Sequence, residues 1–188
     1  MAIQTLAIQH LLDTVAVGSH LLFPPGSYRT GPLVLHRPVG MQVAPGVLLQ
    51  HHASTIGLAI RKPGERVRVG TKGAPPQRGQ CHDPAFLTVS TAVDVFIGGR
   101  GSTVDANGFN GSSLCIADSC NVTVESLLLR GSCSWSTHIF RSRMVVASGV
   151  KIFSGADGLD PDNSQDVTIA RECVRSQQRR FDRRQSHD

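Results

Sequence analysis

The feature that most constrains the fold is an internal repeat in the second half of the chain. Segments 119–129, 142–152 and 164–174 align with one another, and each begins at a serine followed by two short runs of apolar and β-branched residues. Ser142 follows Ser119 by 23 positions, and Ser164 follows Ser142 by 22. Residues 92–97 match the first half of the same unit. A period in the low twenties, with short strands and no helix, predicts the coils of a parallel β-helix.

Two other β-rich or repetitive architectures fit this pattern less well. Leucine-rich repeats have a similar period, but they need a recurrent Leu-x-x-Leu-x-Leu frame that the sequence lacks. A β-sandwich contains similar strands, but it does not require a constant offset between like residues. The repeat therefore favours an all-β solenoid. We expect the following side chains to point into one continuous core: Val122, Val124, Leu127, Leu129, Val145, Val150, Ile152, Val167 and Ile169.

The rest of the chain fits one domain built around this solenoid. The 188 residues are 40% hydrophobic, enough for a single core. An N-terminal helix over residues 2–16 is predicted to cap the first coil, because Ile3, Leu6, Leu11, Leu12 and Val15 recur at roughly helical spacing. Short strands and Gly/Pro turns follow from residue 20, and a polar stretch at about 61–83 predicts a long surface loop. The predicted domain is 1–176, with a β-helical body over 20–176.

The charge of the chain is concentrated at its C-terminal end. Lys and Arg number 19 against 14 Asp and Glu, a formal net charge of +5, and residues 171–188 hold six of the basic and three of the acidic residues. Such a distribution indicates a basic tail, 177–188, on a nearly neutral body, so we expect no nucleic-acid binding by the body. The arginine run at 179–184 is typical of a solvated, disordered tail, with polyanion binding as the alternative.

The sequence predicts neither a membrane-spanning helix nor an export signal. No uncharged apolar run approaches the roughly 20 residues of a membrane helix, and no basic region followed by an apolar stretch and cleavage site opens the chain. We therefore expect no membrane partner. The cellular location is left open.

The cysteines predict buried or singly paired thiols rather than a metal centre. There are five, an odd number without CxxC spacing: Cys81, Cys115, Cys120, Cys133 and Cys173. The pairs His51-His52 and Cys81-His82 lack a second pair at ligand spacing, so neither a metal nor another cofactor is expected. Asn110 and Asn121 each begin an N-glycosylation sequence, which matters only if the chain is exported.

Three segments, in their observed order, resemble the polygalacturonase family of glycoside hydrolases. They are residues 23–33 (Phe-Pro-Pro-Gly-Ser-Tyr-Arg-Thr-Gly-Pro-Leu), 99–108 (Gly-Arg-Gly-Ser-Thr-Val-Asp-Ala-Asn-Gly) and 157–164 (Asp-Gly-Leu-Asp-Pro-Asp-Asn-Ser). The resemblance runs from about residue 2 to 176 and covers the N-terminal half of a typical member. It implies a right-handed parallel β-helix, an inverting hydrolase of galacturonosyl linkages in pectin, and a secreted or cell-wall location.

The resemblance also implies a site residue. Hydrolysis of a glycosidic bond needs one carboxylic acid to protonate the leaving oxygen and a second carboxylate to activate water. Asp157 lies where the family has the aspartate of Asn-Thr-Asp-Gly, so it is the expected remnant of the catalytic set, although here Gly155-Ala156 precedes it. Asp160, a predicted substrate contact, and Asp162 lie in the same turn. The alternative role of Asp157 is to cap its own turn.

The residues one coil after Asp157 depart from the family. Gln178 and Arg179 occupy the places of the family's Asp-Asp pair, and neither side chain can act as a general acid near neutral pH. The later Gly-His-Gly and Arg-Ile-Lys motifs have no counterpart. We therefore expect a polygalacturonase-like chain that is truncated, inactive, and monomeric or prone to aggregation. The alternative is a non-catalytic β-solenoid module that binds pectin or another acidic polysaccharide.

Two aromatic residues form a second candidate group. Trp135 and His138 lie close together in the sequence, and an aromatic face can stack on a pyranose ring, so they are candidate residues of a sugar subsite. The alternative is a tryptophan that packs against neighbouring side chains and a histidine satisfied within a turn.

Overall fold

The computed structural model describes residues 4–52, 77–81, 83–154, 157–171 and 173–176, the last four as backbone. The N-terminal part of the predicted loop and the predicted tail, 177–188, lie outside the described residues.

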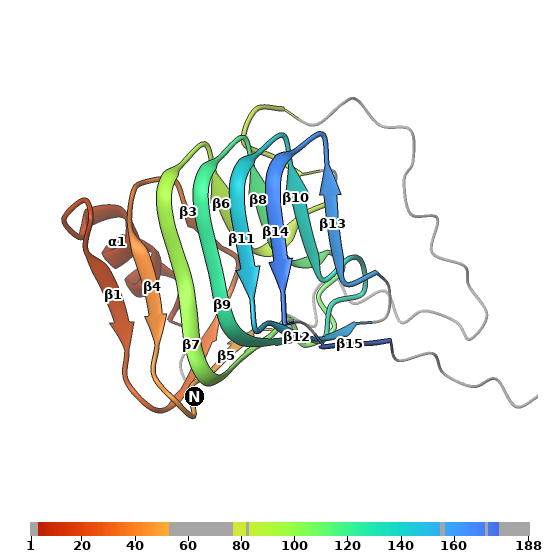
Figure 1. Ribbon diagram of the computed structural model, residues 1–188. Coiled ribbons are helices and arrows are strands. Elements are labelled where there is room, and N and C mark those ends of the chain that lie inside the picture. Colours follow the sequence, from red (N-terminus) through yellow and green to blue (C-terminus); the bar gives the residue numbers. More distant parts are fainter. Residues whose placement is uncertain (1–3, 53–76, 82, 155–156, 172, 177–188) are drawn as a thin grey trace, which may run out of the picture.

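The described chain is a parallel β-solenoid of about five coils with one short helix at its start (Figure 1). Every strand pair in the described part is parallel. The prediction of an all-β β-helix is confirmed. The elements are α1 (Thr5–Thr14), β1 (His20–Phe23), β2 (Ser27–Thr30), β3 (Leu33–Leu35), β4 (Gly40–Val43), β5 (Leu48–His51), β6 (Ala85–Ser90), β7 (Val93–Asp105), β8 (Ser112–Ala117), β9 (Cys120–Arg130), β10 (Thr137–Phe140), β11 (Arg143–Ser148), β12 (Lys151–Ser154), β13 (Leu159–Asp162), β14 (Gln165–Ala170) and β15 (Cys173–Ser176).

The strands form two sheets that run along the axis of the solenoid. One has the order β3-β6-β8-β10-β13, and the other contains the path β1-β4-β7-β9-β11-β14. In the second sheet, β2, β5, β12 and β15 pair around the far ends of the long strands β7 and β9, which bend through the corner of the coil (Figure 1). A register shift between Gly98 and Ser102 marks that corner in β7.

The internal repeat is the repeat of the coils. Val122, Val145 and Val167 are register partners on β9, β11 and β14, and Leu129 is paired with Ile152 on the second limb. The partial repeat at residues 92–97 stacks in the same register, because Val95 and Ile97 of β7 pair with Val122 and Val124. Seven of the nine predicted core residues are buried: Val122, Val124, Leu127, Leu129, Val145, Val150 and Ile152.

The two exceptions lie on the last coil. Val167 is half-buried, and Ile169 exposes 44% of its surface although it occupies the same register position as the buried Ala147. The reason is that in the described part of the chain β14 pairs with β11 alone, so its inward side chains are covered on one side only. The prediction that Ile169 is buried was wrong, although its inward position in the repeat was right.

The corners of the coils are also repeated. Asp94, Asn121, Met144 and Asp166 all adopt a left-handed backbone conformation at equivalent positions of successive coils. Serines stack nearby: the backbone N–H of Ser119 donates to Ser142 Oγ (3.1 Å), and that of Ser142 to Ser164 Oγ (3.0 Å). These bonds explain why each repeat begins with serine.

The N-terminal helix is shorter than predicted and presents a different face. It spans Thr5–Thr14, and its buried residues are Ile8 and Leu12, one turn apart, whereas Leu6 and Leu11 are 86% and 47% exposed. The expectation that Leu6 and Leu11 lie on the buried face was wrong. Ile8 and Leu12 lie on the same side of the helix, four residues apart, and this is the side that packs against the coil. The Gln9 side chain exchanges two hydrogen bonds with the backbone of Val34, both 2.9 Å. The helix thus satisfies part of the free edge of β3.

Candidate functional site

Three of the predicted site residues meet at one end of the five-stranded sheet. His138 of β10 is the register partner of Asp160 on β13, the last strand of that sheet. The ring of Trp135 lies just before β10, with its centroid 4.9 Å from that of His138. Neighbouring coils therefore bring these residues together, as the fold of a solenoid predicts.

His138 is inaccessible, whereas Trp135 is half-buried. The imidazole has 0% side-chain exposure and lies between Trp135 and Phe140, whose ring centroid is 5.6 Å away. Its Nε2 atom is 3.9 Å from Asp162 Oδ2. His138 therefore packs between the Trp135 and Phe140 rings and is not open to a ligand. Of the two rings, the one that a ligand can touch is that of Trp135.

Asp157 lies at the entry to β13 and is exposed. Its carbonyl oxygen accepts a hydrogen bond from the backbone N–H of Ser136 (2.9 Å), which places it on the coil next to the Trp135 segment. Asp160 and Asp162 are half-buried. The turn therefore offers one open carboxylate and two that the surrounding chain partly covers.

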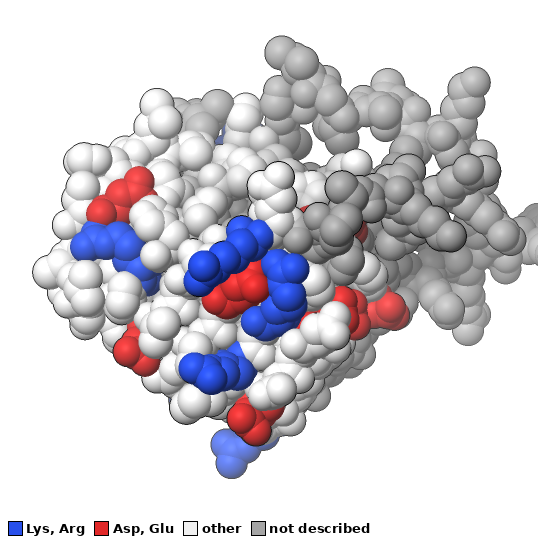
Figure 2. Space-filling model, turned by 90° about the horizontal axis from the view of Figure 1, so that it is seen from above, with Lys and Arg blue, Asp and Glu red and all other residues white. Residues whose placement is uncertain are grey.

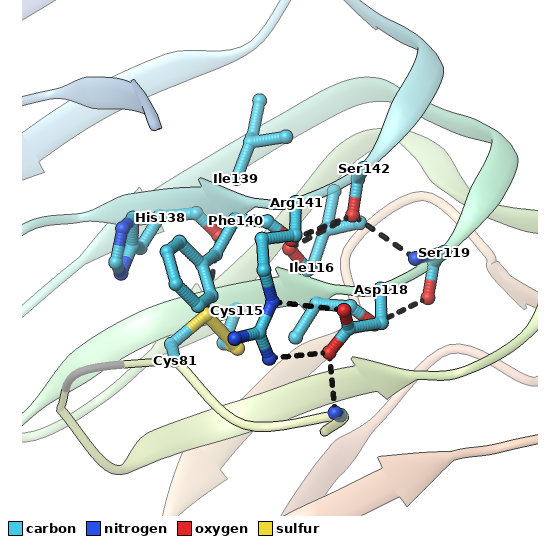
Figure 3. Close-up of a disulfide and its surroundings, with 12 residues drawn as sticks. Cys81, Cys115, Ile116, Asp118, Ser119, His138, Ile139, Phe140, Arg141 and Ser142 are labelled. Atoms are coloured by element: carbon cyan, nitrogen blue, oxygen red, sulfur yellow. Dashed lines mark hydrogen bonds and ion pairs between the residues drawn. A yellow bond between two sulfur atoms is a disulfide. The ribbon is translucent and has the colours of Figure 1, made fainter. Parts of the chain in front are cut away.

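A short irregular segment, made of residues 77–81 and 83 and here named the strap, is fixed beside this site (Figure 3). A disulfide joins Cys81 to Cys115 of β8, and the Gly79 N–H donates to Asp118 Oδ2 at 2.5 Å. At the far end of the strap, the Asp83 carboxylate accepts a hydrogen bond from the Ser134 hydroxyl, next to Trp135. The strap is therefore bonded to β8, to Asp118 just after β8, and to Ser134 just before β10. Its cysteine belongs to a second small apolar cluster, separate from the main core: Cys81, Ala85, Cys115, Ala117 and Phe140.

An ion pair fixes the other side of the strap. Arg141 donates to Asp118 through Nε (2.9 Å) and a terminal nitrogen (2.8 Å), and also to the carbonyl of Gln77 (3.0 Å). The hydrogen bond from Arg141 is the main cause that lowers the pKa of Asp118, with further lowering by the Gly79 N–H; burial opposes it. The pKa of Arg141 is raised in turn by its bond to Asp118.

Asp83, Asp118 and Arg141 were not singled out from the sequence. A signal for the last two exists, because Asp118 directly precedes Ser119 and Arg141 directly precedes Ser142. Aligning the repeats at their serines therefore places opposite charges on adjacent coils. The pairing of Cys81 with Cys115 has no such signal, since Cys81 lies outside the repeat.

Acidic and basic side chains are mixed on the face that Figure 2 shows. Figure 2 shows blue and red side chains interspersed rather than a basic patch of one sign. Elsewhere, Arg130 donates to Asp105 Oδ2 at 3.0 and 2.9 Å. An anion that binds at Arg130 would therefore have to compete with Asp105.

Metal ligation has little support in the described residues. No group of three or more His, Cys, Asp and Glu residues able to hold a metal occurs among them. The ring of His51 packs against Phe86 and Phe109. Burial is the main cause that lowers the pKa of His51, and the neighbouring His52 lowers it further.

Among the described helices, none has the length and apolar character needed to cross a bilayer.

Comparisons with known proteins support the fold. No family model and no curated protein matches the sequence. A crystal structure of a "putative glycosyl hydrolase" from Parabacteroides merdae is similar, with a TM-score of 0.59, 15% identity, and coverage of 93% of this chain and 92% of the other. An iota-carrageenase complexed to iota-carrageenan fragments has a TM-score of 0.64 at 13% identity. The similarity covers 90% of this chain and 37% of the carrageenase, so the chain spans little more than a third of that enzyme.

Proposed function

We propose that this chain is a polygalacturonase-like β-helix that binds an acidic polysaccharide, with pectin as the ligand class. The observation that carries this proposal is the juxtaposition of the segment 157–162 with Trp135 on neighbouring coils. That segment lies within residues 157–164, the part of the chain that resembles the segment opening a polygalacturonase active site. The half-buried Trp135 ring beside it offers a flat surface for a sugar.

The proposed activity is binding without hydrolysis. An inverting glycosidase needs two carboxyl groups about 6.5–9.5 Å apart, on opposite sides of the scissile bond. Asp157 is exposed, but Asp160 and Asp162 are half-buried, and Asp162 is turned toward His138. In the described chain no strand follows β13 in its sheet, so no described carboxylate faces Asp157 from the next coil. One carboxylate cannot be acid and base in the same step.

The similar solved structures support the ligand class at a coarse level. The iota-carrageenase binds fragments of a polysaccharide. A β-helix can present a long surface along its coils, which suits an extended polymer more than a small molecule.

The test measures binding and hydrolysis on the same chain. Polygalacturonate is titrated against the purified protein while new reducing ends are counted, and iota-carrageenan and a neutral glucan serve as comparison polymers. We expect saturable binding to polygalacturonate with no release of reducing ends. Trp135→Ala should weaken binding about tenfold, equivalent to about 1.4 kcal/mol. Asp166→Asn, at a corner of the other sheet, is the matched control and should leave binding unchanged.

Three outcomes would contradict the proposal. Reducing ends that appear with wild type and disappear with Asp157→Asn would show an active hydrolase. Tighter binding to iota-carrageenan would reassign the ligand to a sulfated polymer. Lack of binding to every polymer would remove the proposed function while leaving the fold intact.

A further inference from the structure

The two N-glycosylation sequences of the chain lie in different structural settings. Asn110 is an exposed residue of the bend that joins β7 to β8. Asn121 is also exposed, but it belongs to β9 and occupies one of the repeated left-handed corners. A glycan is bulky and must project from the surface, so these settings differ in what they permit.

The side chain of Asn121 is part of the contact between coils. Its Nδ2 atom donates to Asp94 Oδ1 of the preceding coil at 2.6 Å. Met144 occupies the equivalent corner of the following coil. Strands in adjacent coils are about 4.8 Å apart, so a sugar attached to Nδ2 would have to share this narrow spacing with both neighbours. A glycan at Asn121 would therefore disturb the stacking of the coils.

Asn110 lies in a turn whose backbone is already fixed. The N–H of Phe109 donates to the Ala106 carbonyl (2.8 Å), and the N–H of Gly111 donates to the Phe109 carbonyl (2.9 Å). The N–H of Ser112 then donates to the carbonyl of Pro84 (2.9 Å). These bonds define the turn while the Asn110 residue remains exposed.

The disulfide is an independent observation that points to the same chemistry. A bond between Cys81 and Cys115 persists in oxidising compartments, and the eukaryotic secretory pathway is the compartment in which N-linked glycans are attached. We propose that Asn110 carries an N-linked glycan when the chain is made in that pathway, and that Asn121 of the folded protein carries none.

The glycan would border the candidate site. The turn at 106–111 is bonded to the segment before Trp135, because Cys133 N–H donates to the Phe109 carbonyl (3.2 Å) and Ser134 N–H to the Gly111 carbonyl (3.3 Å). A glycan on Asn110 would thus lie at the edge of the surface that includes Trp135. The glycosylation proposal does not depend on what Trp135 binds.

The test is secretion of the full chain from a eukaryotic host behind a heterologous signal peptide. Intact mass is measured before and after treatment with an N-glycan amidase. Two variants remove the first sequence in different ways, N110Q and S112A. Ser112 Oγ is buried and makes no hydrogen bond with the described chain, so S112A should leave the packing intact. The matched controls are N121Q and T123A, which remove the second sequence.

The expected result is one glycan on the secreted wild-type chain, lost in N110Q and S112A and retained in N121Q and T123A. Formation of the disulfide in each variant, read by counting free thiols, reports folding independently of activity. A glycan retained in N110Q and lost in N121Q would overturn the assignment. Secretion of disulfide-bonded wild type without a glycan, or with both positions occupied, would overturn it as well.

Discussion

The inner coils and the last described coil share a sequence pattern but differ in burial. Ile97, Val124 and Ala147 are successive register partners and are at most 2% exposed, whereas Ile169, the next partner, is 44% exposed. The repeat therefore encodes which side of a strand faces inward. Burial itself depends on a neighbouring coil at each side, which is a property of stacking and not of the single unit.

Truncation of one side chain in each region tests this difference most strongly. Ile97→Ala removes a fully buried side chain and should lower the free energy of unfolding by about 2–5 kcal/mol. Ile169→Ala removes the same atoms from a partly exposed position and should cost less than about 1.5 kcal/mol, since little area leaves the core. Denaturant unfolding of both variants, monitored by circular dichroism, measures the difference.

Equal losses in the two variants would contradict the comparison. They would show that Ile169 is covered in solution, either by chain beyond β15 or by a second copy. Size-exclusion chromatography over a range of concentrations distinguishes these explanations, because only association depends on concentration.

The disulfide distinguishes the inner coils in a second way. It joins the strap to β8 across a sequence separation of 34 residues and restricts the unfolded chain. We expect the double variant Cys81→Ser/Cys115→Ser to lose about 2–4 kcal/mol of stability. Cys133→Ser changes an exposed free thiol and should change stability by less than about 0.5 kcal/mol. Thermal unfolding with and without a reductant is the measurement, and reductant should affect wild type but not the double variant.

The fold could be predicted from the sequence because each coil repeats the same short pattern of inward apolar and outward polar residues. The alternation of Val122 and Val124 with polar neighbours fixes two inward positions, and the same rule holds one coil later at Val145 and Ala147. The exposure of Ile169 could not be predicted, since the repeat gives no information on where stacking stops. The buried face of α1 was missed because its short helix offers several apolar stripes, and the coil selects one of them.

The candidate site could be predicted less completely. Proximity of Trp135, His138 and Asp160 follows from the length of one coil, but the burial of His138 depends on Phe140 and on packing that no motif indicates. The strap was missed because Asp83 and Cys81 come from outside the repeat. Contacts between the repeat and an irregular segment are set by three-dimensional geometry alone.

The stacked serines Ser119, Ser142 and Ser164 predict a smaller difference in stability between the inner coils and the last described coil. Ser142 Oγ accepts a hydrogen bond from the buried Ser119, and Ser142→Ala leaves that N–H without this partner, at a cost of about 1–3 kcal/mol. Ser164 plays the same part for Ser142 but is half-buried, so water can replace it. We expect Ser164→Ala to cost about half as much. Hydrogen exchange of the Ser119 and Ser142 amides would show which bond is lost, and equal effects would contradict the contrast.

The smallest expected effect concerns the charged corner formed by Asp118 and Arg141. The pKa of Asp118 is lowered in the folded state, mainly by its hydrogen bond to Arg141, from an ordinary value of 3.8. A carboxyl whose folded pKa lies below its unfolded pKa stabilises the protein above the unfolded value, and this stabilisation is lost as the pH falls through the folded value. Asp118→Asn should therefore melt at a lower temperature than wild type at neutral pH. The difference should persist to about pH 4 and close below it. Thr91→Gly changes the equivalent left-handed corner one coil before Asp118, where the hydroxyl donates to the backbone carbonyl of Ser90, and its melting difference from wild type should not close in acid. A difference for Asp118→Asn that stays constant from neutral pH to about pH 2.5 would show that the ionised carboxylate contributes nothing to holding the strap on the inner coils.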